Sequence, residues 1–332
     1  MVAIDLQRIK DSLIETEFPQ YVIVEPTNYC NLKCIMCPHE VMPRVKGFMD
    51  FELFKKIVDE ITLKSPKSKL WPAVLGESLI AGDRFKKMVD YAVGKQVDIV
   101  LNTNGTLLND DWIDYITFSG IKEVILGIDG LTKETYEKVR VNGQHERMRQ
   151  SLIKLIKSCH DVDGAPSVIL QYIVMQENEH EVEDFKTYWL KQGAIVKVRL
   201  KQGWGDHISN ELPYSHKDRA FPSPWLIRNF LVLWDGTVCQ CDADCCEARA
   251  QVGNLRDSSI QELWLGELKQ RRMRHWQGDF SDALCLTCDD WQVGLSEFYY
   301  PDGYKKATMP MRDKANAQFG AQPQKLDTAR YE

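Results

Sequence analysis

Three cysteines lie within the eight-residue segment "CNLKCIMC", at Cys30, Cys34 and Cys37 of the 332-residue chain. Thiolates with this C-x3-C-x2-C spacing can ligate three irons of a cubane [4Fe–4S] cluster and leave the fourth iron free. A structural zinc loop completed by His39 is the alternative, because zinc prefers four protein ligands. Either way, the segment predicts a metal site.

Six further cysteines gather towards the C-terminal end, and they are Cys239, Cys241, Cys245, Cys246, Cys285 and Cys288. Cys159 stands alone in a segment with helical spacing, and we expect it to be a small buried hydrophobe. Such grouping indicates metal or redox chemistry when the thiols are kept reduced.

The composition is that of an ordinary soluble globular protein, with 44% hydrophobic and 27% charged residues. The net charge of −6 gives no indication of a nucleic-acid or anionic membrane partner. We find no run that could span a bilayer, and the N-terminus lacks the apolar core of a signal peptide. A cytoplasmic location, where thiols stay reduced, is therefore expected.

Short β-branched runs alternate with helical patterns about six times between residues 21 and 200. This alternation predicts a parallel sheet with helices outside, in an α/β fold. A partial, open (β/α)6 barrel resembling a TIM barrel is one solution, and a doubly wound open sheet is the other. In both, ligands gather where the strands end, and "CNLKCIMC" follows the first strand.

The sequence pattern changes after residue 200, where a segment rich in Gly and Pro precedes a small cysteine-rich region. Asp235-Gly236 between two β runs predicts a hairpin. A helix is expected to begin after Ser258 or Ser259, with Glu262 placed for a capping box. We therefore divide the chain into a helical lead (1–18), a core (19–200), a cysteine-rich hairpin-plus-helix domain (201–291) and a tail (292–332).

The segment "EPTNYCNLKCIMCP" resembles the signature of the radical S-adenosylmethionine (radical SAM) superfamily. The resemblance implies a [4Fe–4S] cluster on Cys30, Cys34 and Cys37 whose open iron binds S-adenosylmethionine. It also implies a 5′-deoxyadenosyl radical that removes hydrogen from the substrate. The external one-electron reductant would be of the flavodoxin or ferredoxin type.

Later loops resemble the cofactor-contacting segments of that superfamily. They are "LGESLI", "NTNGTLL" and "GIDG", each after a predicted strand, and the residues implied are Gly76, Glu77, Thr103, Asn104, Gly127 and Asp129. The first loop departs from the family pattern, since a Leu precedes the Gly and Ser78 replaces the usual Pro.

The segment from "PSPW" to the final "CLTC" resembles the SPASM or twitch extension, which holds auxiliary [4Fe–4S] clusters. Two fully cysteine-ligated cubanes would need eight thiolates and only six are present, so one auxiliary cluster is expected. The predicted ligands are Cys241, Cys246, Cys285 and Cys288, with Cys245 or Cys239 as alternatives for the position of Cys246. Phe221 stands where many members have a cysteine. A zinc knuckle, or a cluster with three cysteines and the substrate as fourth ligand, is the alternative.

Asp242 and Asp244 are the candidate catalytic bases, because in alcohol-oxidising members an acid near the auxiliary ligand takes the substrate proton. Both could instead be turn-forming residues. The resemblance favours oxidation of a small molecule, a sugar or aminocyclitol alcohol, in natural product biosynthesis. Only 29 residues precede Cys30, fewer than a peptide-binding domain needs. Peptide or protein maturation and radical epimerisation are the alternatives, and a non-enzymatic iron–sulfur electron carrier is a further one.

Overall fold

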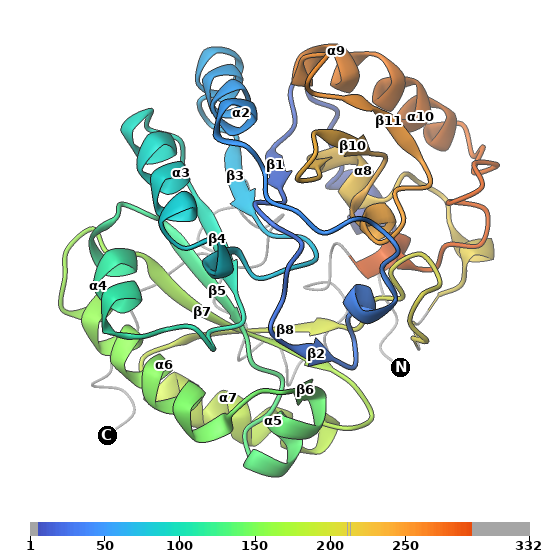
Figure 1. Ribbon diagram of the computed structural model, residues 1–332. Coiled ribbons are helices and arrows are strands. Elements are labelled where there is room, and N and C mark those ends of the chain that lie inside the picture. The colour runs from blue at the N-terminus through green and yellow to red at the C-terminus, as the bar shows by residue number, and fades with distance from the viewer. Residues whose placement is uncertain (1–5, 211, 213, 294–332) are drawn as a thin grey trace.

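The computed structural model describes residues 6–210, 212 and 214–293. Its centre is a row of parallel strands that follow one another in chain order (Figure 1). They are β1 Tyr21–Val24, β3 Lys69–Pro72, β4 Val100–Thr103, β5 Glu123–Gly127, β7 Ser167–Val174 and β8 Ile195–Leu200. The step from β3 to β4 is a single parallel bridge between Leu70 and Ile99. All six predicted strands are present.

The strand order decides between the two predicted architectures. A doubly wound sheet reverses its strand order near the middle, whereas these six strands run sequentially. Each crossover then has the same hand and all the crossover helices cover one face, which curls the sheet into a partial barrel. The partial (β/α)6 barrel is therefore confirmed, and the ends of all six strands face one opening.

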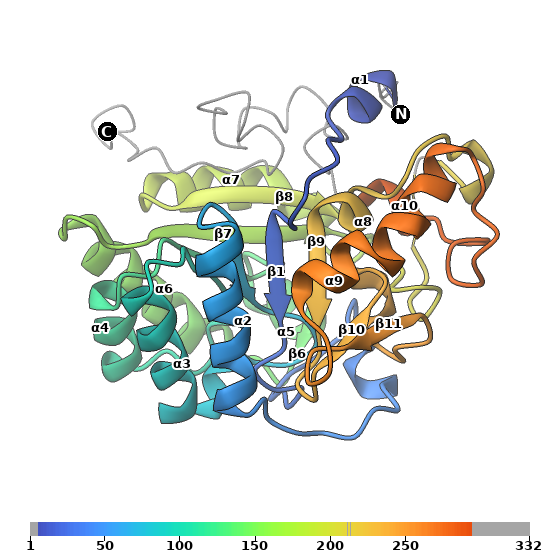
Figure 2. The same ribbon diagram turned by 90° about the horizontal axis from the view of Figure 1, so that it is seen from above.

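The helices form the outer layer around these strands (Figures 1 and 2). They are α2 Phe51–Lys64, α3 Asp83–Gly94, α4 Asp110–Phe118, α5 Lys133–Val139, α6 His145–His160 and α7 Val182–Lys191, with a short α1 Leu6–Asp11 before the barrel. Side chains of Asp50, Asn109 and Thr132 accept backbone N–H groups at the starts of α2, α4 and α5. These caps satisfy donors that a helix cannot satisfy internally.

The two faces of the sheet bury different side chains. The outward face packs against the helices in the largest apolar cluster, which includes Cys159, as expected for that lone cysteine. The inward face is filled by a layer of Val100, Ile125, Ile169 and Ile195, against which Trp71 packs. Because this layer plugs the barrel beneath the strand ends, polar chemistry is confined to the open end.

The C-terminal region continues the same sheet. Strand β9 (Asn229–Val232) pairs in parallel with β1, and β10 (Thr237–Cys239) and β11 (Gln251–Asn254) follow antiparallel. The hairpin at Asp235-Gly236 is present, and Gly236 adopts a φ of 93°, which suits glycine. Further short elements are α8 Pro224–Arg228, β2 Lys33–Cys34 and β6 Arg140–Val141.

The long helix predicted after Ser258 or Ser259 forms as two. Ser259 and Glu262 make the capping box of α9 (Ile260–Leu265), and Gly266 then interrupts the helix before α10 (Glu267–Trp276). Within the described ranges, no helix has the length and apolar character needed to cross a membrane. The predicted tail lies outside the described residues except for 292 and 293, as do residues 1–5 of the lead.

Candidate functional site

The cysteine loop after β1 is fastened to a returning segment of the chain. The buried Asn28 side chain donates to the Val45 carbonyl at 2.9 Å and accepts from the Gly47 N–H at 2.8 Å. Thr27 also donates to the Gly47 carbonyl at 2.7 Å. A loop held at both ends presents its three thiols in a fixed arrangement at the barrel opening.

The three thiols are spaced for a cluster rather than for a single ion. Burial raises the pKa of Cys30 to about 11, and burial together with the neighbouring Cys34 raises that of Cys37 to about 12. Cys30, Cys34, Cys37 and His39 offer four possible ligand atoms. Among the described residues, no three of these four atoms all lie within 4.8 Å of one another. Tetrahedral zinc with Zn–S bonds of about 2.3 Å would bring its sulfurs to about 3.8 Å. A cubane [4Fe–4S] cluster, with irons at alternate corners and one thiolate on each of three irons, holds its ligands farther apart.

His39 does not complete a zinc site with these thiols. Its Nε2 lies 2.9 Å from the Asn28 carbonyl oxygen, so that nitrogen carries a proton and donates. The imidazole thus supports the loop through Nε2. Its buried Nδ1 has no hydrogen-bond partner, but it forms with no two of the thiols a group whose ligand atoms lie within 4.8 Å of one another in the part of the chain that the structure describes. The three-thiol donor set therefore fits the [4Fe–4S] cluster better than the zinc alternative.

The loop after β3 brings Glu77 beside the thiols. The carboxylate is 1% exposed and accepts from Thr103 Oγ1 at 2.8 Å and from the Asn104 N–H at 2.7 Å. Asn104 Nδ2 in turn lies 3.9 Å from Cys30 Sγ. Burial raises the pKa of Glu77 despite these bonds. Glu77 Oε2 accepts one hydrogen bond, from the Asn104 N–H, and a carboxylate oxygen can accept two. A cationic amino group would be a suitable second donor to this oxygen.

Gly76 is required by the close approach of two backbones. Its φ is 143°, and a Cβ there would lie 2.3 Å from the Thr27 carbonyl oxygen of the cysteine loop. The Glu77 N–H donates to the Tyr29 carbonyl at 2.8 Å, so the two loops are joined directly.

Asp129, after β5, is fully buried and forms an ion pair with Arg140. Its other oxygen accepts from the Ile173 N–H at 2.5 Å. Arg140 Nη1 lies 3.6 Å from Cys34 Sγ, and a Cβ on Gly127 would lie 2.1 Å from Arg140 Nη2. Asp129 thus holds a guanidinium against the thiols, and Gly127 leaves room for it.

Arg140 is a site residue that the sequence patterns did not single out. It begins β6, which pairs with β2 so that Arg140 lies opposite Cys34. The one signal available was the break of helical spacing at "RVNG", which separates α5 from α6. Nothing in that break specifies which earlier segment the arginine contacts.

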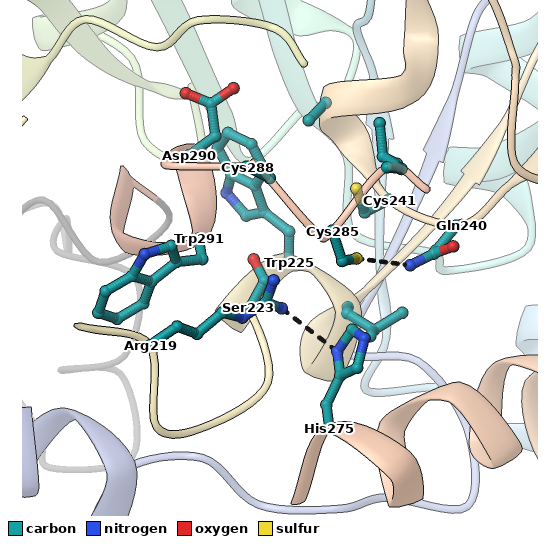
Figure 3. Close-up of a pocket in the computed structure, with 13 residues that line it drawn as sticks. Arg219, Ser223, Trp225, Gln240, Cys241, His275, Cys285, Cys288, Asp290 and Trp291 are labelled. Atoms are coloured by element: carbon teal, nitrogen blue, oxygen red, sulfur yellow. Dashed lines mark hydrogen bonds between the residues drawn. The ribbon is translucent and has the colours of Figure 1, made fainter. Parts of the chain in front are cut away.

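A second site lies in the C-terminal region, where a pocket brings together three of the predicted ligands (Figure 3). Cys241, Cys285 and Cys288 line it. Gln240 Nε2 donates to Cys285 Sγ at 3.0 Å. Burial raises the pKa of Cys241 well above its usual value, and the thiols of Cys285 and Cys288 raise it further. Three thiols in one pocket fit an iron–sulfur cluster that lacks one cysteine ligand.

The structure separates Cys246 from these three cysteines. It does not line the pocket, and it packs with Cys239 and Cys245 in an apolar cluster that also contacts Cys37. Its Sγ lies 3.8 Å from the Pro38 carbonyl oxygen, on the side of the first cysteine loop. The expected fourth ligand, whether Cys246 or Cys245, therefore stays a prediction without support from the geometry.

The two candidate bases have different surroundings. Asp244 is 2% exposed, and its carboxylate accepts from the Arg249 and Ala250 N–H groups, both at 2.8 Å. Both of its oxygens are thus used to hold the loop. Asp242 accepts from Asn229 Nδ2 at 2.6 Å, and its Oδ1 has no hydrogen-bond partner among the described residues. Burial raises the pKa of Asp242 to about 7.

Comparison with known families explains both cysteine sites. Residues 24–188 match the radical SAM superfamily, and residues 224–289 match the SPASM iron–sulfur cluster-binding domain.

Two curated relatives are similar to part of the chain. The tungsten-containing aldehyde ferredoxin oxidoreductase cofactor-modifying protein of Pyrococcus furiosus is 29% identical over 198 residues, 58% of this chain and 52% of that protein. Mycofactocin maturase MftC of Mycobacterium tuberculosis is 23% identical over 207 residues, 61% of this chain and 50% of that protein. The chain thus spans about half the length of these relatives.

Solved structures share the fold over more of the chain. BtrN in complex with AdoMet and 2-DOIA has a TM-score of 0.56 at 16% identity, covering 83% of this chain and 94% of BtrN. Streptococcus suis SuiB bound to precursor peptide SuiA has a TM-score of 0.64 at 12% identity, covering 95% of this chain and 78% of SuiB. The cofactors are a [4Fe–4S] cluster, S-adenosylmethionine and an auxiliary iron–sulfur cluster. The chain belongs to the radical SAM superfamily and has a C-terminal SPASM domain.

Proposed function

We propose that this radical SAM enzyme is an oxidoreductase that removes hydrogen from an alcohol carbon of a small molecule, a sugar or an aminocyclitol. The observation that carries the proposal is the acid Asp242, which directly follows Cys241 and has a buried carboxylate oxygen without a hydrogen-bond partner among the described residues. In their bound state, the cofactors supply a radical that takes a hydrogen atom and an acceptor for one electron.

The location of Asp242 supports its role as the base. Asp242 follows Cys241, which lines the second pocket. The charge of Arg199, on β8, lowers the pKa of both Asp242 and Asp129, although burial dominates at both carboxyls. Asp242 is thus adjacent in the chain to a predicted ligand of the auxiliary cluster, and the charge of one arginine acts both on it and on Asp129 at the first site.

The carbinol carbon loses a hydrogen atom, its hydroxyl loses a proton to Asp242 Oδ1, and one electron leaves, which gives a carbonyl. Asp244 has no comparable role, because both of its oxygens accept backbone N–H groups of its own loop. The neighbouring Asn229 orients Asp242 through its 2.6 Å hydrogen bond.

Ribosomal peptide maturation is the second candidate, and the resemblance to MftC and to SuiB favours it. A peptide would use the same hydrogen-abstracting site but would need no base at Asp242. The two candidates therefore differ in what an Asp242 variant does.

The test uses reconstituted enzyme, reductant and a panel of cyclitols and amino sugars carrying deuterium on their carbinol carbons. We expect deuterium to appear in 5′-deoxyadenosine together with a carbonyl product. Asp242→Asn should keep the deuterium transfer and lose most of the carbonyl product, whereas Asp244→Asn, if folded, should keep both. Transfer from a peptide substrate and from no alcohol would contradict the proposal.

A further inference from the structure

The second pocket lacks a fourth cysteine because of Phe221. The likeness to SPASM domains places a cysteine at this position, but the phenyl ring packs edge-on against Trp291, with ring centroids 5.2 Å apart. Both rings are almost fully buried. Among the described residues that line the pocket, the cysteines are the three already named, so the remaining ligand must be of another type.

His275, in the last turn of α10, lies in the same pocket (Figure 3). Its side chain is fully buried, and its Nε2 makes no hydrogen bond of good geometry, since the carboxylate atom it faces, Asp282 Oδ2, is 3.5 Å away. Ligand atoms of His275, Asp282 and Cys285 lie within 4.8 Å of one another, the one such group in the part of the chain that the structure describes. A buried imidazole nitrogen without a partner, next to a thiol ligand, is a ready metal ligand.

We propose that His275 is the fourth protein ligand of the auxiliary iron–sulfur cluster, together with Cys241, Cys285 and Cys288. This assignment rests on the SPASM cluster and not on the identity of the substrate. It would therefore stand if alcohol oxidation were disproved.

Asp290 and Gln240, two other polar residues of the pocket, are already engaged. Asp290 accepts from the Gly203 N–H at 2.6 Å, the Gly205 N–H at 3.1 Å and Asn210 Nδ2 at 3.1 Å. Gln240 donates to Cys285. Neither residue has the free nitrogen or thiolate that iron–sulfur clusters take from proteins.

Arg219 must change its hydrogen bond when His275 binds iron. Its Nη2 now lies 3.2 Å from His275 Nδ1, so Nδ1 accepts and the ring proton is on Nε2. Iron at Nε2 requires that proton to move to Nδ1, and Arg219 can then no longer donate there. Arg219 still has the Phe221 carbonyl, 3.3 Å from its Nε, and the adjacent Cys285.

A single metal ion on His275, Asp282 and Cys285 is the competing use of the same atoms. Asp282 does not line the pocket, and its carboxylate is also paired with Arg274 at 2.6 Å. A single ion would leave Cys241 and Cys288 unused. The cluster uses all the thiols of the pocket, so we favour it, and metal analysis separates the two.

The test uses the full-length chain with Cys30, Cys34 and Cys37 changed to Ala, so that only the auxiliary site holds a cluster. After anaerobic reconstitution and reduction, pulsed electron paramagnetic resonance reports nitrogen coupled to the cluster. We expect a strong nitrogen coupling that changes when the histidines are labelled with ¹⁵N. His275→Cys should keep about four irons and lose this coupling. The reduction potential should fall, because a thiolate adds a negative charge.

Cys246→Ala is the matched control, and it should keep both the iron and the nitrogen coupling. His275→Gln tests loss of the ligand at similar volume, with circular dichroism to check the fold; if it does not fold, His275→Cys still decides. The proposal is overturned if the parent variant shows no histidine coupling or binds zinc in place of iron. Loss of the cluster in Cys246→Ala, with the coupling unchanged in His275→Cys, overturns it as well.

Discussion

The two cysteine sites of this protein each offer three thiols, but their fourth positions face different surroundings. At the first site the neighbours are Glu77 and Arg140, a carboxylate and a guanidinium. These charges complement the amino and carboxylate groups of an amino acid such as the methionyl part of S-adenosylmethionine. At the second site the neighbour is the buried imidazole of His275.

This difference shows that counting cysteines does not determine what an iron–sulfur site does. An open position becomes a cofactor site when charged groups from several strand ends surround it. It becomes a closed electron-transfer site when one buried neutral side chain fills it.

The largest effect is expected from Cys30→Ala, Cys34→Ala and Cys37→Ala combined. Cleavage of S-adenosylmethionine to 5′-deoxyadenosine should fall to background, because the ligands of the cofactor-binding cluster are removed. Chromatography of the reaction mixture measures it. Cys159→Ala is the control, since this thiol is buried on the outer face of the sheet. Cleavage that survived in the triple variant would place the cofactor at the second site instead.

A smaller effect is expected from Glu77→Gln. A hydrogen bond to a charged group contributes about 1.5–3 kcal/mol, so the Kd for S-adenosylmethionine should rise by about 10- to 100-fold. Equilibrium dialysis with reconstituted protein measures it. Glu52→Gln, on the first turn of α2, should leave the Kd unchanged. An unchanged Kd in Glu77→Gln would mean that this carboxylate serves only the loop.

Asp244→Asn should destabilise the second region by about 2 kcal/mol. An amide offers one acceptor oxygen where the carboxylate offers two, so one of the Arg249 and Ala250 N–H groups stays buried without a partner. Denaturant unfolding of the purified protein measures this loss. Asp242→Asn is the control and should cost less, because the amide can still bond to Asn229 and no backbone donor depends on Asp242. Equal losses would remove the distinction between the two acids.

The smallest effect concerns the support of the first site. Glu181 accepts from the Leu131 N–H at 2.7 Å and from Thr135 Oγ1 at 2.7 Å, which fixes the loop that follows Asp129. Burial opposes ionisation of Glu181, but hydrogen bonds from Thr132, Leu131 and Thr135 outweigh it and lower the pKa.

The sign of the pH dependence follows from this lowered pKa. The ionised carboxylate stabilises the fold at neutral pH, and this contribution is lost as the pH falls below the usual carboxyl pKa. Glu181→Gln should therefore cost about 1 kcal/mol from pH 7 down to about pH 5, and progressively less from there towards about pH 3. Thermal unfolding at several pH values measures the difference. A constant difference across that range would show that the carboxylate charge plays no part.

Much of this architecture was predictable because its signals are local. Strand-and-helix alternation gave the six β/α units, and cysteine spacing with the segments at the strand ends gave the superfamily and its cofactor. The choice between a barrel and a doubly wound sheet was not local, since both have the same alternation. The strand order decided it.

The sequence by itself determined the three-thiol loop, the superfamily, the SPASM region and the acids worth testing. Each of these is recognised from residues that are close together in the chain. Only the tertiary structure distinguished Asp242 from Asp244, separated Cys246 from the other predicted ligands, and brought Arg140 and His275 to the two sites. These outcomes depend on contacts between residues far apart in the chain, such as Arg140 with Cys34 and Arg219 with His275. The spacing of residues along a sequence does not predict such contacts, because the direction and burial of a side chain are set only when the helices and strands pack together.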